Sequence, residues 1–136
     1  MKKKKVQAII YKKEGGKRKY LLLHRKLHWV GWEHLKETME QGESYEDTIR
    51  RGVKEETGVG KMKLEREKKV NIPIGGNGEI VHAYVIEIGA KEKINVTKEK
   101  EHDDYKWVDK EEALELLTYK NARELLKELT DSEESE

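Results

Sequence analysis

Residues 43–59, ESYEDTIRRGVKEETGV, carry the most informative pattern in the sequence. Ser44 is a good residue for a helix N-cap, and Asp47 can close a capping box by accepting a hydrogen bond from the Ser44 backbone. Gly58 can end the helix, because glycine readily adopts the left-handed conformation of the residue that follows a helix. The sequence therefore predicts one helix that begins after Ser44 and ends before Gly58.

Two adjacent carboxylates, Glu55 and Glu56, fall near the C-terminal end of this predicted helix. The helix dipole disfavours negative charge there, and neighbouring carboxylates also repel each other. A divalent cation removes that penalty, and Mg²⁺ prefers oxygen ligands. Taken alone, the pair is typical of a solvated surface, because 42% of the residues are charged.

The segments on either side of the helix have strand patterns. The first two are joined by a turn at Gly15 and Gly16, which accept positive φ freely. A second turn is predicted at Gly75-Gly76-Asn77-Gly78, whereas residues 27–43 are polar and predicted to be irregular. The predicted strands are residues 5–12, 18–25, 63–72, 79–88 and 105–108.

Two helices are predicted after the last strand. Asp109 can cap the first of them, and the second carries an apolar stripe at i, i+3, i+4 and i+7. The stripe consists of Ala122, Leu125, Leu126 and Leu129. Strands followed by helices favour an α/β fold with a mixed sheet and helices packed against it.

Length and composition limit the function classes. With 136 residues, the chain is predicted to form a single domain over residues 1–130, followed by an acidic flexible tail at 131–136. No cysteine and no long apolar run is present, so we expect a cytoplasmic protein without a membrane partner. The net charge of +1 argues against a nucleic-acid partner, and the Lys/Glu-rich composition indicates a thermophilic source. The histidines show no zinc-ligand spacing with cysteine, so no His-based metal site is expected.

Acidic, basic, glycine and aliphatic positions around the predicted helix keep a defined spacing. They are Glu43, Arg51, Val53, Glu55, Glu56, Gly58 and Val59. Within residues 37–59 this spacing resembles the Nudix box, G-x5-E-x7-R-E-U-x-E-E-x-G-U, in which U is aliphatic. The resemblance implies the Nudix fold, an α/β/α sandwich with a mixed central sheet. It also implies a pyrophosphohydrolase that cleaves a nucleoside-diphosphate-linked substrate by metal-activated water, with Mg²⁺ or Mn²⁺ as cofactor.

The same resemblance implies roles for the box residues. Glu43 and Arg51 would pair to brace the loop before the helix, with Gly58 closing the box. Glu55 and Glu56 would bind metal and act as catalytic residues.

The chain also resembles the asymmetrical diadenosine tetraphosphate hydrolases. Trp32 and Lys36 match their W-x3-K, and residues 101–107 match their E-H-x2-Y-x-W. This resemblance implies a nucleotide or dinucleoside polyphosphate substrate, with Lys36 at a phosphate and Glu101 as a metal ligand or catalytic base. Tyr105, Tyr84 and Trp32 are candidates for stacking on the base, although aromatic residues at strand ends are often packing residues.

Two positions depart from the box. Glu37 stands where the family has glycine, and Gly52 stands where it has a glutamate that binds metal. Glycine inside a helix costs about 1 kcal/mol relative to alanine, so a side chain at position 52 is expected to be better tolerated. Three hypotheses remain open: Glu37 replaces the lost metal ligand, hydrolysis continues at a reduced rate with Glu55, Glu56 and Glu101, or the domain only binds nucleotides as a regulatory module.

Overall fold

Over the residues that the computed structural model describes, 4–74, 77–96 and 101–134, the chain forms seven strands and three helices. The strands are β1 (Lys4–Glu14), β2 (Lys17–Arg25), β3 (Gly31–Glu33), β4 (Leu35–Thr38), β5 (Lys63–Ile74), β6 (Asn77–Glu87) and β7 (His102–Val108). The helices are α1 (Tyr45–Thr57), α2 (Lys110–Leu116) and α3 (Lys120–Glu134).

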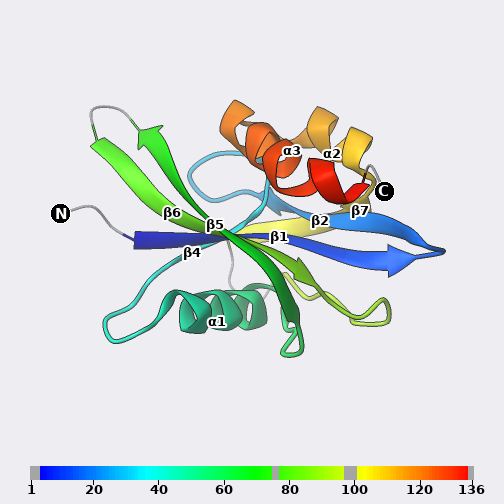
Figure 1. Ribbon diagram of the computed structural model, residues 1–136, viewed down its shortest axis with the longest axis horizontal. Helices are drawn as coiled ribbons and strands as arrows, with labels where there is room; N and C mark the ends of the chain where they lie inside the picture. The colour runs from blue at the N-terminus through cyan, green and yellow to red at the C-terminus, as the bar shows by residue number, and fades with distance from the viewer. Residues whose placement is uncertain (1–3, 75–76, 97–100, 135–136) are drawn as a thin grey trace.

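The strands form one mixed sheet. Its main order is β3-β2-β1-β6-β5, with β4 also pairing with β1 and β7 with β2. The β1–β6 pair is parallel and the other pairs are antiparallel. Helix α1 covers one face of this sheet, and α2 and α3 cover the other (Figure 1). The predicted α/β/α sandwich is therefore confirmed.

Side-chain alternation divides the core between the two faces. Along β1, Val6, Ala8 and Ile10 join the cluster under α1, whereas Ile9 and Tyr11 join the cluster under α2 and α3. This follows from the two-residue repeat of a strand. The apolar stripe predicted for the last helix is buried in the second cluster.

The local predictions for α1 and the first hairpin are confirmed. The Asp47 amide donates to Ser44 Oγ and the Ser44 amide donates to an Asp47 carboxylate oxygen, so both bonds of the capping box are present. Gly58 ends the helix in the left-handed conformation, with φ of 81°. Gly15 and Gly16 also have positive φ, as the tight turn requires.

Two predictions of segment boundaries differ from the structure. Residues 27–43 are not irregular throughout, because β3 and β4 add short antiparallel pairings to β2 and β1. Helix α3 continues to Glu134, so it overlaps the tail predicted at 131–136. In the predicted turn at 75–78, residues 75–76 lie outside the described residues and Asn77 already pairs with Ile74. Among the described residues, no helix has the length and apolarity needed to span a bilayer.

Candidate functional site

Two carboxylate side chains and one imidazole meet at the C-terminal end of α1. Glu56 projects from the helix and is only 5% exposed. His102 is the first residue of β7 and Glu101 directly precedes it, and one ligand atom from each of the three side chains lies within 4.8 Å of the others. Carboxylate oxygens suit Mg²⁺ or Mn²⁺, so the two glutamates fit a divalent metal.

His102 lies between two buried carboxylates. Its Nδ1 is 3.1 Å from Glu56 Oε2, and its Nε2 is 2.8 Å from Glu33 Oε2. Burial disfavours the charged imidazole, but the hydrogen bonds and charges of Glu33 and Glu56 outweigh it and raise the pKa of His102 to about 9. At neutral pH both ring nitrogens therefore donate, and the ring is a cation that braces Glu56.

Glu33 is a second buried acid in the same network. Its Oε2 accepts from Arg25 Nη1 at 3.1 Å as well as from His102, while its Oε1 is buried with no hydrogen-bond partner. Burial alone would raise the pKa of this carboxyl group, but the His102 hydrogen bond and the Arg25 charge bring it below its ordinary value. Glu33 is therefore ionised in the folded protein.

Arg51 organises the loop that leads into α1. Its Nε and Nη2 donate to the two Glu43 oxygens at 2.7 and 2.9 Å, in a bidentate geometry. These bonds lower the pKa of Glu43 to about 2 and raise the pKa of Arg51 above its ordinary value. Nη1 lies 3.3 Å from carboxylate oxygens of Glu37, Glu40 and Glu55. One guanidinium thus holds four carboxylates around the box loop.

The two positions that depart from the box lie against each other. Glu37 is on β4, and like Leu35 it points toward α1. A Cβ atom added at Gly52 would lie 2.9 Å from Glu37 Cβ and 3.1 Å from Glu37 Cγ. The Glu37 side chain therefore occupies the space into which a residue at 52 would project. Burial raises the pKa of the Glu37 carboxyl group, although Arg51 opposes this shift.

The structure brings some of the predicted site residues together and leaves others apart. Glu56 and Glu101 share one group, whereas Glu37 and Glu55 lie with Arg51. Tyr105 lies beside Leu23 in the ladder, as Glu33 does on the other side, so all three face α1.

The other two candidates on β3 and β4 face away from the carboxylates. Trp32 packs toward α2 and α3, with its ring 4.8 Å from that of His24. Lys36 alternates with Leu35 and Glu37, so it points away from α1. The structure does not bring either side chain to Glu56, and their substrate-binding roles stay predictions.

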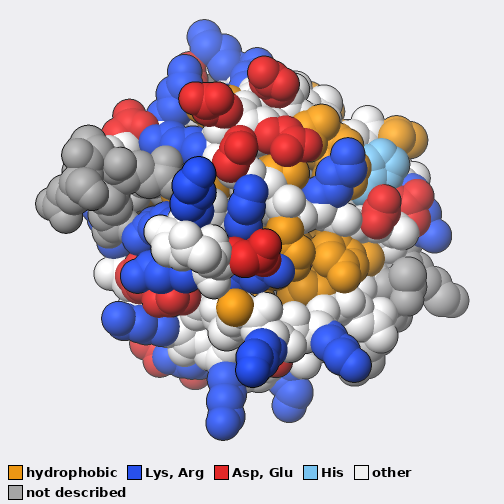
Figure 2. Space-filling model, turned by 90° about the vertical axis from the view of Figure 1, so that its right-hand side faces the viewer, with side chains coloured by type: hydrophobic (Ala, Val, Ile, Leu, Met, Phe, Trp, Pro, Cys, Tyr) orange, Lys and Arg blue, Asp and Glu red, His pale blue; other side chains and the backbone are white. Residues whose placement is uncertain are grey.

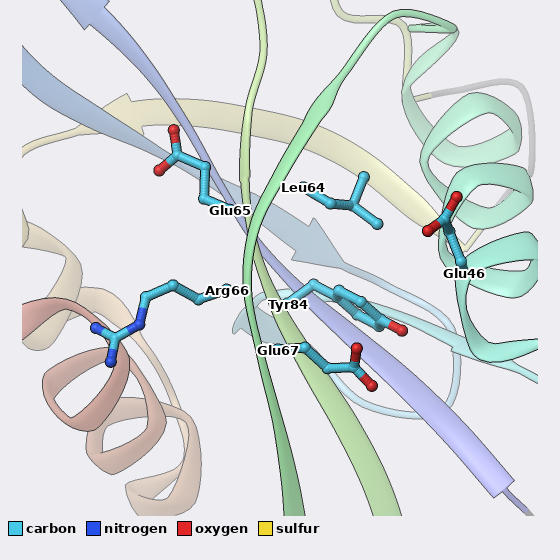
Figure 3. A pocket seen from close by; sticks show the side chains of 6 residues that line it. All are labelled: Glu46, Leu64, Glu65, Arg66, Glu67 and Tyr84. Atoms are coloured by element: carbon cyan, nitrogen blue, oxygen red, sulfur yellow. The ribbon is translucent and has the colours of Figure 1, made fainter.

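Tyr84 is placed in a different part of the sheet, near the N-terminal end of α1. It is 4% exposed and borders a hollow of about 210 Å³. Figure 3 shows Tyr84 on the same side of β5 as Glu67 and facing Glu46 of α1, while Glu65 and Arg66 point to the other side. Burial and the neighbouring Glu67 raise the pKa of Tyr84 to about 12. So little exposed ring surface limits the stacking predicted for this residue.

Sequence reasoning missed the parts played by Glu33, His102 and Arg25. The sequence gives no specific role to His102, although this residue follows Glu101 directly in the E-H-x2-Y-x-W segment. Glu33 carried no signal, because an acid next to a tryptophan in a charged chain resembles an ordinary surface residue. Only the fold brings these residues together, across 69 positions of sequence between Glu33 and His102.

Surface charge is mixed on the face seen in Figure 2. Over its described part, Lys and Arg side chains stand among Asp and Glu side chains around a group of hydrophobic side chains. Acidic groups interrupt the basic ones, so this face gives no support for a nucleic-acid partner.

Comparisons with known proteins agree with this architecture. The family model for the NUDIX domain matches residues 1–129. The Ap4A hydrolase of C. elegans, solved as a binary complex, superposes with a TM-score of 0.85 at 21% identity, covering 98% of both chains. The NUDIX domain of Shewanella oneidensis NrtR, complexed with ADP ribose, gives 0.79 at 17% identity, covering 97% of this chain and 88% of that one. The E. coli dihydroneopterin triphosphate pyrophosphohydrolase gives 0.73 at 21%, covering 92% of each chain. A comparison with curated proteins gives no match.

Proposed function

Since this chain belongs to the Nudix family, we propose that it is a pyrophosphohydrolase that cleaves a nucleoside-diphosphate-linked substrate with metal-activated water. The observation that carries this proposal is the meeting of Glu56 and Glu101 beside His102 at the end of α1. The two acids come from segments far apart in the sequence, and an oxygen-rich group of this kind suits Mg²⁺ or Mn²⁺.

Glu56 and Glu101 would hold the metal, which when bound supplies charge for the phosphates and lowers the pKa of a bound water. His102 keeps one Glu56 oxygen in a hydrogen bond and thereby limits the rotation of the carboxylate. Arg51 fixes the loop before α1 through Glu43, so the strand that carries Glu37 stays against the helix. Glu101 remains the proposed base, since it is only partly buried and belongs to the same group.

We propose Glu37 as the replacement for the carboxylate missing at position 52. Its Cβ and Cγ fill the space beside Gly52, and its carboxylate lies with Glu55 at Arg51. Glu37→Gln keeps the packing and removes the charge. We expect this variant to weaken Mn²⁺ binding, and unchanged affinity would remove Glu37 from the metal site.

A dinucleoside polyphosphate is the proposed substrate. The W-x3-K and E-H-x2-Y-x-W segments support this choice, and the C. elegans protein with the same fold is an Ap4A hydrolase. Tyr105 is the aromatic candidate for the base, because it lies on the same face of the sheet as Glu33.

Nucleotide binding without hydrolysis is the second candidate function. Gly52 favours it, because the helix lacks one carboxylate of the box. The NrtR domain, whose structure contains ADP ribose, shows that this fold can hold such a nucleotide.

Phosphate release with Mg²⁺ or Mn²⁺ distinguishes the two candidates. The panel should contain diadenosine tetraphosphate, ADP ribose and nucleoside triphosphates, with Glu56→Gln as the inactive control. Hydrolysis that Glu56→Gln abolishes supports the enzyme. Saturable nucleotide binding in calorimetry without turnover of any panel member would favour the binding module instead.

A further inference from the structure

A chain of four ionisable side chains leads from the end of β2 to the C-terminal end of α1, where the proposed metal site lies. Arg25 Nη1 lies 3.1 Å from Glu33 Oε2, that oxygen lies 2.8 Å from His102 Nε2, and His102 Nδ1 lies 3.1 Å from Glu56 Oε2. The side chains of Glu33, His102 and Glu56 are 5%, 3% and 6% exposed. Water therefore competes little for these contacts.

We propose that Glu33 is a positioning residue, which orients the His102 ring so that the ring holds one oxygen of Glu56 and leaves the other for the cation. This inference rests on the proposed metal site. The cation it concerns is Mg²⁺ or Mn²⁺.

The hydrogen-bonding capacity of the groups supports this direction. His102 offers one ring nitrogen to each of the two carboxylates, Nε2 to Glu33 and Nδ1 to Glu56, so both of its hydrogen-bonding positions are occupied. Glu33 fixes the Nε2 side, and a planar ring fixed at one nitrogen has its other nitrogen aimed in one direction. Outer partners of this kind orient the groups around metals, and losing one commonly reduces metal affinity about 10–100-fold.

The cost of Glu33 also favours a functional role. A buried carboxylate is expensive to desolvate, and here the Oε1 atom has no hydrogen-bond partner to offset that expense. A buried ion pair can often be replaced by apolar residues without loss of stability. The burial of Glu33 is therefore poorly explained by stability alone, whereas its 2.8 Å contact with His102 explains it through the site.

Mn²⁺ affinity, measured by calorimetry on the metal-free protein, tests the proposal. Glu33→Gln keeps the shape and an acceptor but removes the charge, whereas Glu33→Ala removes both. We expect affinity to fall about 10–100-fold in Glu33→Ala, with partial rescue in Glu33→Gln. The matched control is Glu65→Gln, because Glu65 is also mostly buried and accepts a hydrogen bond from Tyr11 on the other face of the sheet. The control variant should retain wild-type affinity.

A double-mutant cycle tests whether Glu33 acts through His102. In the His102→Asn background, Glu33→Gln should have no further effect on Mn²⁺ affinity, because the intermediary is gone. An equal effect in both backgrounds would overturn the proposal, as would unchanged affinity in Glu33→Ala. Urea unfolding in the presence of chelator identifies any variant that loses affinity because it does not fold. If Glu33→Ala does not fold, the Mn²⁺ affinity of Glu33→Gln alone decides the test.

Pulsed electron paramagnetic resonance of bound Mn²⁺ supplies a second measurement. The proposal predicts no nitrogen coupling from a directly bound imidazole, because His102 uses both nitrogens on carboxylates. A strong coupling lost in His102→Asn would show that His102 is a ligand and would overturn the proposal. If the wild-type protein binds no Mn²⁺ at all, the proposed function fails too. If the wild-type protein binds Mn²⁺ and substitutions at Glu33 leave the affinity unchanged, only the positioning role of Glu33 is overturned.

Discussion

Alanine at position 52 should destabilise this protein even though the position is inside a helix. The general preference for alanine over glycine is about 1 kcal/mol in favour of the variant. In this structure the new Cβ would lie 2.9 Å from Glu37 Cβ, well inside normal contact. Glu37 Cβ is fixed to the β4 backbone, so it cannot move aside as the end of a side chain can. Overpacking of this kind costs about 1–3 kcal/mol, which exceeds the gain.

The same change should be favourable once Glu37 is shortened. In the Glu37→Gly background the clash disappears and only the helix preference of about 1 kcal/mol remains. The free-energy coupling between the two positions is therefore about 1–3 kcal/mol, the size of the overpacking that one variant has and the other lacks. Alanine is used at 52 because it tests the packing without adding a charge.

Urea unfolding of wild type, both single variants and the double variant measures this coupling. Chelator is present throughout, so that metal binding does not contribute. The matched control is Gly60→Ala, since a Cβ at Gly60 meets nothing within 4 Å. Gly60→Ala should show no coupling to Glu37→Gly. If the effects of Gly52→Ala and Glu37→Gly on the free energy of unfolding were additive within about 0.5 kcal/mol, Glu37 would not fill the space beside position 52.

The remaining predictions concern binding and pH. Glu56→Gln should abolish measurable Mg²⁺ or Mn²⁺ binding in calorimetry, because it removes the charge at the centre of the proposed site. Tyr105→Ala should raise KM for a nucleotide substrate more than it lowers kcat, if Tyr105 stacks on the base. Hydrogen bonds from Arg51 depress the pKa of Glu43 to about 2, below the value of about 4.3 in the unfolded chain. The resulting stabilisation is fully present above about pH 4.3 and is lost as the pH falls toward 2. In Glu43→Gln, the free energy of unfolding should therefore depend less on pH over this range. Burial lowers the pKa of His34 from 6.5 to about 4, so the unfolded state takes up a proton at a higher pH than the folded state. As the pH falls from 6.5 to about 4, the free energy of unfolding should decrease in wild type and decrease less in His34→Gln.

The features that could be predicted best from the sequence are those that depend only on residues close together in the chain. The caps of α1 are local, since Ser44 and Asp47 bond each other and Gly58 needs only its own φ. The amphipathic stripe of α3 is likewise local, because it depends on apolar residues spaced three and four positions apart in the sequence. Such features carry their own signal and need no information about the rest of the fold.

What could not be predicted depends on contacts between distant segments. Strands β3 and β4 have three and four residues, too few for an alternating pattern to stand out. Two buried polar residues, Glu33 at the end of β3 and His34 between the two strands, resemble loop residues in the sequence because the partners that make their burial tolerable come from β7 and α3. The expectation that any side chain would suit position 52 was wrong for the same reason. Helix propensity describes the helix alone, whereas Glu37 approaches from another element.

The two departures from the Nudix box, Gly52 on α1 and Glu37 on β4, lie on elements that pack against each other. Acid is missing from the middle of α1 at Gly52, and acids are present on the facing strands, with Glu33 on β3 and Glu37 on β4. Both strand acids point toward the helix, and each is tied to a cation, His102 or Arg51, that also holds a box glutamate. The glycine allows β4 to approach the helix closely enough for this arrangement, because any Cβ at 52 would collide with Glu37. Gly52 and Glu37 are thus coupled by packing, because Glu37 can hold this position only while residue 52 has no side chain.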